Sequence, residues 1–412
     1  MKSRKKRLSQ NLNILFWGRA FTQVKIMNAV IVLFYLHRGV SIDQVFFLSV
    51  AWSLANLAFE VPSGYLADRF GRKGTLLLAV FLSVLVWIAT WFAQGFVAFI
   101  GVFILMAFAH SCFSGTEEAA LYDTLKELGR EKEVTKYNGR LHSAKHIIAI
   151  FGPAIGAIIA RDLVEVQFQM LVAIELILTA AALLVYIKFT EPKHKKDVSK
   201  YEIGIFKSSI ETIKHHPFLL RISMNRVLVF TSTLLVWRIS QPYLQESGVS
   251  VVMLGAFYVV LQGGAFFSKW SVGYLEKRFG IVMMLRWTAF AVIVMAAGAL
   301  VVQTSWLLFL LIVGILIIGA LREPIFAGVL NVHIDSENRA TTLSNLNIIK
   351  GIVDIPLMIT GGLLAAGQMD NVIILAAAVS FVAVIFFPVR TSDLTRREVC
   401  VKPLVSAGEE LA

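Results

Sequence analysis

The sequence predicts an all-α membrane protein with twelve transmembrane helices in two pseudo-symmetric six-helix bundles. Composition, the spacing of apolar segments and an internal repeat predict this fold class. Of the 412 residues, 57% are hydrophobic and 16% are charged, and the 30 phenylalanines outnumber the 27 acidic residues. Soluble domains carry about 25% charged residues, so most of this surface is expected to face lipid.

Twelve apolar segments each approach the roughly 20 residues that a helix needs to cross a bilayer. Lipid offers the backbone no hydrogen-bond partner, and the segments lack the alternation of barrel strands, so each is expected to be helical. The segments cover residues 13–37, 44–66, 74–93, 96–120, 139–160, 168–188, 219–244, 251–275, 281–302, 306–330, 344–366 and 371–389.

The distribution of basic residues predicts the orientation in the membrane. The connections on one side hold 28 lysines and arginines, whereas those on the other side hold Arg38 and Arg161. The positive-inside rule therefore predicts a protein of the plasma (inner) membrane with both termini in the cytoplasm. Anionic headgroups account for the net charge of +12, so membrane lipid and not nucleic acid is the expected charged partner.

The segments divide the chain into five parts. A cytoplasmic N-terminus (1–12) precedes a first bundle (13–189), and a linker (190–218) leads to a second bundle (219–389) and a cytoplasmic tail (390–412). Apolar residues recur at helical spacing in the linker, which predicts an amphipathic helix on the inner membrane surface. They are Ile203, Phe206, Ile210 and Ile213. We expect the protein to be a monomer without a cofactor.

An internal repeat relates the two bundles. GYLADRFGRK at 64–73 returns as GYLEKRFGIV at 273–282, an offset of 209 residues. The same offset pairs Phe21-Thr22 with Phe230-Thr231, Asn138 with Asn347, and Gly152 with Gly361. A duplicated six-helix unit of this kind is expected to enclose a shared site near the middle of the bilayer.

The twelve segments, the repeat and the motif at 64–73 resemble the major facilitator superfamily of secondary transporters, over roughly residues 10–390. SGTEEAALYD at 114–123 is similar to a bacterial branch of drug-efflux-like permeases. GPAIGA at 152–157 resembles a signature of proton-coupled exporters, although Ala157 replaces its last glycine. The resemblance implies that a solute crosses by alternating access.

In this superfamily, the acid of the motif at 64–73 pairs with basic residues and with the N-terminal end of helix 11, which closes the cytoplasmic side. The resemblance therefore implies a conformational latch, and Lys277 in place of the aspartate predicts a weaker second copy. An anchor of positive charge is the alternative for the basic residues. The latch residues are Gly64, Asp68, Arg69, Gly71, Arg72, Gly273 and Arg278.

Helices 1, 4, 7 and 10 line the central cavity in this family, so their polar residues are the expected substrate contacts. Arg19 and Arg226 occupy nearly equivalent positions and could grip an anionic group or brace the helix ends. Lys25 is expected to pair with Glu117 or to face the cavity, whereas Arg238 and Lys269 are expected to reach the membrane surface. The cavity set is Arg19, Gln23, Lys25, Asn28, His110, Glu117, Asn225, Arg226, Arg322 and Glu323.

Asp354 in helix 11 is the leading expected proton carrier, because burial favours a protonated carboxyl. Lys350 lies one turn away, so a structural ion pair is the alternative. Glu175 and Glu117 are the next acids to consider, since helix 1 carries none.

The resulting hypothesis is a secondary active transporter of a small organic solute, coupled to an ion gradient (protons are the expected ion) and exporting. The alternatives are an uptake permease for a small organic anion and a transporter-like sensor or scaffold. The sequence has no H-E-x-x-H, G-x-S-x-G or P-loop pattern, so neither an enzyme nor ATP-driven transport is expected, and no metal site is expected.

Overall fold

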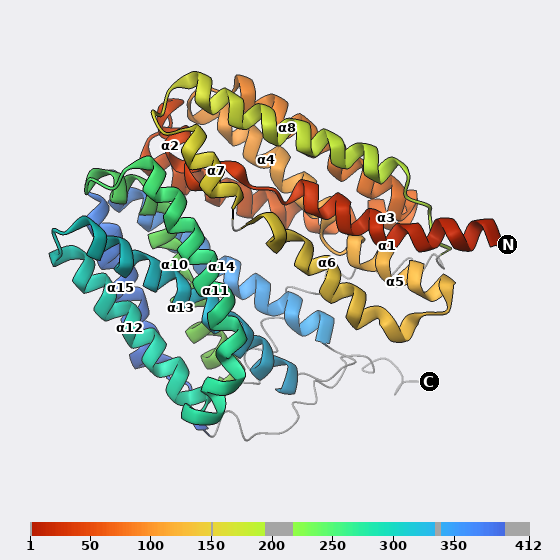
Figure 1. Cartoon of the computed structure of the whole chain (residues 1–412). Helices are drawn as coiled ribbons and strands as arrows, with labels where there is room; N and C mark the ends of the chain where they lie inside the picture. Colours follow the sequence, from red (N-terminus) through yellow and green to blue (C-terminus); the bar gives the residue numbers. More distant parts are fainter. Residues whose placement is uncertain (1, 150, 194–216, 334–338, 392–412) are drawn as a thin grey trace, which may run out of the picture.

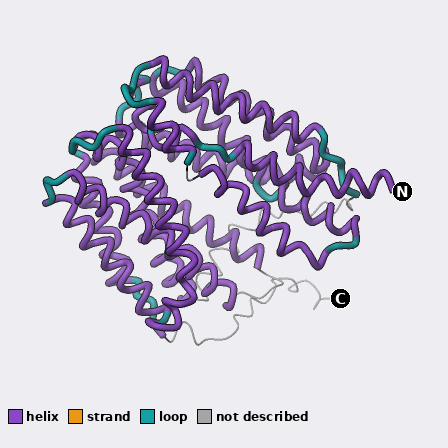
Figure 2. Tube along the Cα trace, in the orientation of Figure 1, coloured by secondary structure: helices purple, strands orange, loops and turns teal. Residues whose placement is uncertain are grey.

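The computed structural model describes residues 2–149, 151–193, 217–333 and 339–391, which form helices joined by short turns (Figures 1 and 2). The first bundle comprises α1 (Lys2–Thr22), η1 (Ile26–Ala29), α2 (Ile31–His37), α3 (Ile42–Phe92), α4 (Gly95–Phe113), α5 (Thr116–Leu128), η2 (Glu131–Glu133), α6 (Val134–Ala149), α7 (Gly152–Ile159) and α8 (Glu165–Ile187). The second comprises α10 (Pro217–Glu246), α11 (Val251–Phe279), α12 (Ile281–Val301), α13 (Ser305–His333), α14 (Arg339–Ala365) and α15 (Met369–Phe386). The expected linker helix at 203–213 lies outside the described residues.

Within the described ranges, eight helices are long and apolar enough to cross a membrane, or nine if the bent pair Arg4–Ala29 and Ile31–His37 (63°) is one span. Three predicted spans fall short by this measure. One is divided between α6 and α7, and α10 and α14 carry many polar side chains. Among these helices, α7 packs against α11 and α14 packs against α3 of the other bundle, and the fold is the predicted helical membrane architecture.

The motif at 64–73 and its copy at 273–282 adopt the same local structure. Gly71 (φ 83°, ψ 167°) breaks α3 into two spans, and Gly280 (φ 76°, ψ 150°) separates α11 from α12. A positive φ of this kind favours glycine. Arg69 donates to the Tyr65 hydroxyl at 3.3 Å, as Arg278 does to Tyr274 at 3.2 Å. The structure thus reproduces the sequence repeat residue by residue.

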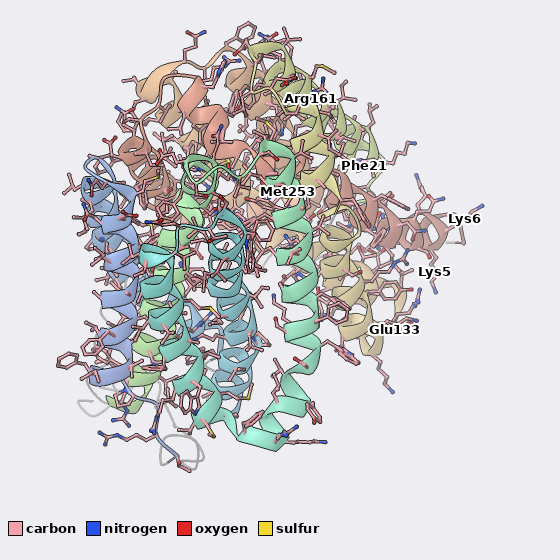
Figure 3. The ribbon with its side chains drawn as sticks, turned by 60° about the vertical axis from the view of Figure 1, so that its left-hand side comes forward. Lys5, Lys6, Phe21, Glu133, Arg161 and Met253 are labelled. Atoms are coloured by element: carbon pink, nitrogen blue, oxygen red, sulfur yellow. The ribbon has the colours of Figure 1, made fainter. Side chains whose placement is uncertain are left out.

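The two ends of the bundles differ in charge. We call the end with the N-terminus, Gly71 and Gly280 the basic face, and the end with Arg38 and Arg161 the opposite face. Lys5, Lys6 and Glu133 lie at the basic end of the first bundle, far from Arg161 (Figure 3). In Figure 1 the bundles converge near α2, α7 and α10 and diverge toward the basic face.

Small residues let the bundles approach each other near the opposite face. A Cβ on Gly255 of α11 would lie 2.9 Å from the Ala157 Cβ of α7. A Cβ on Gly361 of α14 would lie 3.1 Å from the Phe46 ring of α3. Since lipid provides little hydrophobic force between helices, this close packing is what holds such interfaces together.

Gln241 of α10 joins the bundles by hydrogen bonds. Its Oε1 accepts from the Val32 amide at 2.8 Å, and its Nε2 donates to the Asn28 carbonyl at 2.7 Å and the Tyr258 hydroxyl at 3.1 Å. Val32 and Gln241 are 209 residues apart, the offset of the repeat. Equivalent residues therefore meet here, which places the local pseudo-twofold axis between them.

Candidate functional site

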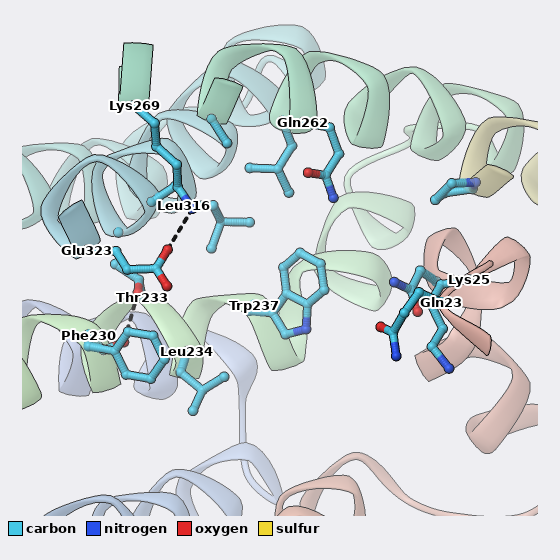
Figure 4. A pocket seen from close by; sticks show the side chains of 16 residues that line it. Gln23, Lys25, Phe230, Thr233, Leu234, Trp237, Gln262, Lys269, Leu316 and Glu323 are labelled. Carbon is cyan, nitrogen blue, oxygen red and sulfur yellow. Dashed lines mark hydrogen bonds and ion pairs between the residues drawn. The ribbon is translucent and has the colours of Figure 1, made fainter. Parts of the chain in front are cut away.

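A cavity of about 420 Å³ lies between the bundles (Figure 4). Its walls come from the break in helix 1 and from α7, α10, α11 and α13, and Asn28 belongs both to its lining and to the Gln241 contact. The contacts near the opposite face close it on that side, so the arrangement is open toward the basic face. Its size falls within the range of small-molecule sites. The lining residues are Gln23, Lys25, Asn28, Pro153, Phe230, Thr233, Leu234, Trp237, Leu261, Gln262, Ala265, Lys269, Leu316, Gly319, Ala320 and Glu323.

The first helix breaks where it reaches the cavity. It is non-helical at Val24 and Lys25 before the short helix η1, and the buried Glu175 carboxylate of α8 accepts from the Met27 amide at 3.3 Å. The acceptor satisfies a backbone donor that the break leaves free. Lys25 lies with its ammonium 5.8 Å from the centre of the Trp87 ring. A discontinuous membrane helix with a charge at the break is a common form of transporter binding site.

Lys269 and Glu323 form an ion pair at the other end of the cavity, with Nζ 2.6 Å from Oε2. Figure 4 shows the pair on one side, Lys25 and Gln23 on the other, and Trp237 between them. The Glu323 side chain is 65% exposed, so the cavity surface carries charge at both ends. Our expectation that Lys269 reaches the membrane surface is wrong, because it turns toward Glu323 instead.

Asp354 lies directly behind the cavity wall. Its Oδ2 is 2.5 Å from Lys350 Nζ, and its Oδ1 accepts from the Thr231 hydroxyl. The Lys350 ammonium is 4.9 Å from the centre of the Phe230 ring, which lines the cavity. The two residues that the sequence singled out for coupling are therefore paired, one side chain away from the cavity.

Arg19 and Glu117 pair with each other inside the first bundle. Arg19 Nη1 is 2.9 Å from Glu117 Oε2, and Glu117 Oε1 accepts from the Tyr186 hydroxyl at 2.5 Å. Gly115, with φ 72°, breaks the predicted fourth helix and begins α5, which turns Glu117 toward this pair. Glu117 therefore pairs with Arg19 and not with Lys25. Neither Arg19 nor Glu117 lines the cavity.

Asn225 and Arg322 lie within the second bundle and not in the central cavity, contrary to the expectation. Arg322 donates at 2.6 Å to the Leu285 carbonyl, the Thr288 hydroxyl and the Asn225 side-chain oxygen. Asn225 also donates to two carbonyls of the α15 region, of Ala383 and Phe387. This cluster ties together α10, α12, α13 and α15.

His110 and Arg226 lie near charged residues of the cavity without appearing in its lining. The His110 Nδ1 and the Asn56 side-chain oxygen are 3.0 Å apart, joining α4 to α3, and the charges of Arg19 and Lys25 act on His110. Arg226 lies within range of the charge of Glu323. The structure therefore brings Gln23, Lys25, Asn28 and Glu323 together as cavity residues, and the other predicted contacts are not part of the cavity lining.

The latch motif forms a network within the first bundle. Arg72 contacts Asp68 at 3.5 Å and Asp123 at 3.3 Å. The Glu191 carboxylate accepts from the amides of Arg72 at 2.8 Å and Lys73 at 2.6 Å, which caps the second span of α3. The side chains at the start of helix 11, near Ser344, lie outside those that the structure describes, so the pairing of Asp68 with that end stays a prediction. Glu191 was not among the predicted residues.

Sequence reasoning also missed Trp237 and Gln262 in the lining, and it misplaced Arg238. Arg238 Nε is buried without a hydrogen-bond partner, and the neighbouring groups that act on its charge are the Tyr35 and Tyr258 side chains. These residues belong to the contact between the bundles and not to a membrane surface.

Comparison with known sequences identifies the relatives of this chain. A sequence model described as Major Facilitator Superfamily matches residues 15–355. The uncharacterized MFS-type transporter YxaM of Bacillus subtilis is 26% identical over 245 residues, 58% of this chain and 59% of that protein. YcaD of Escherichia fergusonii, also an uncharacterized MFS-type transporter, is 22% identical over 303 residues, 71% of this chain and 72% of that protein. The chain thus spans somewhat over half the length of the first of these relatives.

Solved transporter structures share the fold. The nucleoside transporter NupG superposes with a TM-score of 0.74 at 13% identity, covering 95% of this chain and 100% of that one. A bacterial homologue of the lysosomal transporter Spinster, inward-facing and occupied, gives 0.70 at 15% identity over 91% and 96% of the two chains. A bacterial homologue of the iron transporter ferroportin, inward-facing, gives 0.68 at 13% identity over 95% and 99%.

Proposed function

Because the chain belongs to the major facilitator superfamily, we propose that it is a secondary active transporter of a small organic solute, driven by a proton gradient and working as an exporter of the inner membrane. Both termini and the basic face would lie in the cytoplasm. The described state would then be inward-facing. Two solved neighbours are titled as inward-facing structures, which agrees with that orientation.

The observation that carries the proposal is the cavity between two repeated bundles, with charged groups at both ends. It opens toward the basic face and is closed toward the opposite face by contacts between equivalent residues. Equivalent contacts can form on the other side when one bundle rotates against the other, and the cavity then changes sides. A solute that binds there would be carried across.

Asp354 is the proposed proton carrier. It is 6% exposed and accepts a hydrogen bond from Thr231, which is next to the cavity residue Phe230. It holds Lys350, which in turn contacts the cavity residue Phe230. Protonation of Asp354 would release Lys350 from its partner and change the charge beside the bound solute. A proton on Asp354 would therefore affect the cavity through one contact, that of Lys350 with the Phe230 ring.

The test is a transport assay with purified protein in proteoliposomes, using a panel of labelled metabolites and drugs and an imposed pH gradient. Wild-type protein is expected to accumulate at least one solute against its gradient when protons move the other way. Asp354→Asn is expected to abolish this uphill accumulation while leaving exchange of solute down its gradient intact, because the asparagine keeps the shape of the site and loses its charge.

Asp162→Asn serves as the matched control, since Asp162 also pairs with a basic residue, Arg161, but is exposed on the opposite face. If uphill transport is unchanged in Asp354→Asn, Asp354 is not the proton carrier. Accumulation only in the direction of proton entry would favour uptake, and absence of transport for the whole panel would favour a sensor or scaffold.

A further inference from the structure

Two cations at the contact between the bundles have no carboxylate within ion-pair distance among the described residues. The first is Lys25, whose ammonium faces the Trp87 ring. The second is Arg238, whose charge interacts with the side chains of Tyr35 and Tyr258. A cation inside the membrane is costly, so one that is left unpaired is a candidate functional group.

Among the described residues, the charges around the cavity are unbalanced toward the positive. Lys25, Arg226, Arg238 and Lys269 are the cations, and Glu175 and Glu323 are the carboxylates in range. Glu323 already holds Lys269, and Glu175 is bound to the backbone amide of Met27. The pairs Lys350–Asp354 and Arg19–Glu117 behind the walls are neutral. A bound anion would balance the excess.

The two cations also lie on either side of the bond that closes the cavity. Asn28 accepts from Gln241, and Lys25 and Arg238 each precede one of these partners by three residues, about one helical turn. Lys25 lines the open cavity, whereas Arg238 lies with Tyr258, which is itself bound to Gln241. When the Gln241 contact opens, Arg238 becomes accessible from the opposite face.

We propose that the transported solute carries an anionic group, a carboxylate or a phosphate, which Lys25 binds when the cavity opens to the basic face and Arg238 binds when it opens to the opposite face. This inference rests on the proposed transport function and adds the class of the solute. Trp237 lies between the two ends of the cavity (Figure 4), so its indole would contact the apolar part of the solute. Guanidinium and ammonium groups both suit such an anion.

The test measures the melting temperature of the full-length protein in detergent with paired probes: benzoate and benzamide, nicotinate and nicotinamide, indole-3-acetate and its amide, and phenyl phosphate with phenol. At least one anion is expected to raise the melting temperature, and its neutral partner is not. Lys25→Gln and Arg238→Gln are each expected to weaken that binding about ten- to hundredfold, as loss of a charge-assisted contact does. Lys25→Arg and Arg238→Lys should restore most of it.

Arg161→Gln is the matched control, since Arg161 is exposed on the opposite face and pairs with Asp162. Without any probe, Arg238→Gln is expected to melt at the same or a higher temperature than the wild type, because it removes a charged side chain whose buried Nε has no hydrogen-bond partner. Three outcomes would overturn the proposal. None of the anions stabilises the protein, the neutral partners stabilise it equally, or both Lys25→Gln and Arg238→Gln bind the anion as well as the wild type does.

The two proposals fail in different ways. Uphill transport restricted to neutral or cationic solutes would refute the anion site and leave the transport function standing. Anions that bind through Lys25 and Arg238 but never cross the membrane would support the anion site and refute transport.

Discussion

At the scale of single residues, the side-chain direction decides the role of each charged group. Arg322 and Glu323 are neighbours on α13, but one helical step of about 100° separates their directions. Arg322 therefore points into the second bundle and binds Asn225, while Glu323 points into the cavity and binds Lys269. The sequence could show that both are polar residues inside a helix. It could not show their directions, because these depend on how α13 is rotated against its neighbours.

The Arg322 cluster gives a prediction about stability. Arg322→Met leaves the Asn225 side-chain oxygen without its donor, and a buried unpaired group costs about 1–3 kcal/mol. We expect a clear fall in the melting temperature of the purified protein, whereas binding of a cavity ligand to the folded protein stays unchanged. The double variant Arg322→Met, Asn225→Leu should lose less than the sum of the single variants, because the two residues share one hydrogen bond. Additive losses would contradict this coupling.

At the scale of the helices, the sequence predicted the spans and the repeat well but missed the breaks within helices 1 and 4. Apolar runs and their spacing are local signals, so they survive in the sequence alone. The break at Lys25 depends on Glu175, about 150 residues further along the chain, which binds the Met27 amide. The latch has the same limitation. Whether Asp68 meets helix 11 depends on the relative position of the two bundles, which is a property of the conformational state.

Packing of α7 on the broken first helix gives a prediction at this scale. A Cβ on Gly156 would overlap the carbonyl oxygen of Ile26 in η1, which is backbone and cannot rotate away. Gly156→Ala should therefore displace η1 and Lys25, and we expect loss of folded protein or of anion binding in the melting assay. Gly101→Ala is the matched control, since nothing lies within 4 Å of its Cβ and alanine favours a helix by up to about 1 kcal/mol. Equal behaviour of the two variants would show that the α7–η1 contact has no such role.

At the scale of the whole molecule, the repeat explains both the shape and its capacity to change. Gly71 and Gly280 share a backbone conformation, and Val32 and Gln241 meet across the pseudo-twofold axis. This correspondence was predictable from the offset of 209 residues in the sequence. Which face is closed was not, because the same contacts within each bundle are compatible with either state. The closed side is decided by a few contacts between the bundles, and those of Gln241 are polar and specific.

Gln241→Leu is therefore expected to shift the population toward the state that is open to the opposite face. Spin labels would be attached at Glu133→Cys and Lys277→Cys, on the basic faces of the two bundles, in a background without Cys112 and Cys400. Double electron–electron resonance would then report the distance between the two labels. The variant loses two hydrogen bonds between the bundles, each worth about 1 kcal/mol, so the long-distance population should fall at least tenfold relative to the short-distance one.

Gln262→Leu is the matched control for this shift, because Gln262 is a glutamine of the cavity lining that makes no hydrogen bond to the first bundle among the described residues. It should leave the distance distribution as in the wild type. An unchanged distribution in Gln241→Leu would mean that the small-residue contacts at Gly255 and Gly361 close the opposite face unaided. Polar recognition between equivalent residues would then have no part in choosing the state, and the energy of closure would come from helix packing alone.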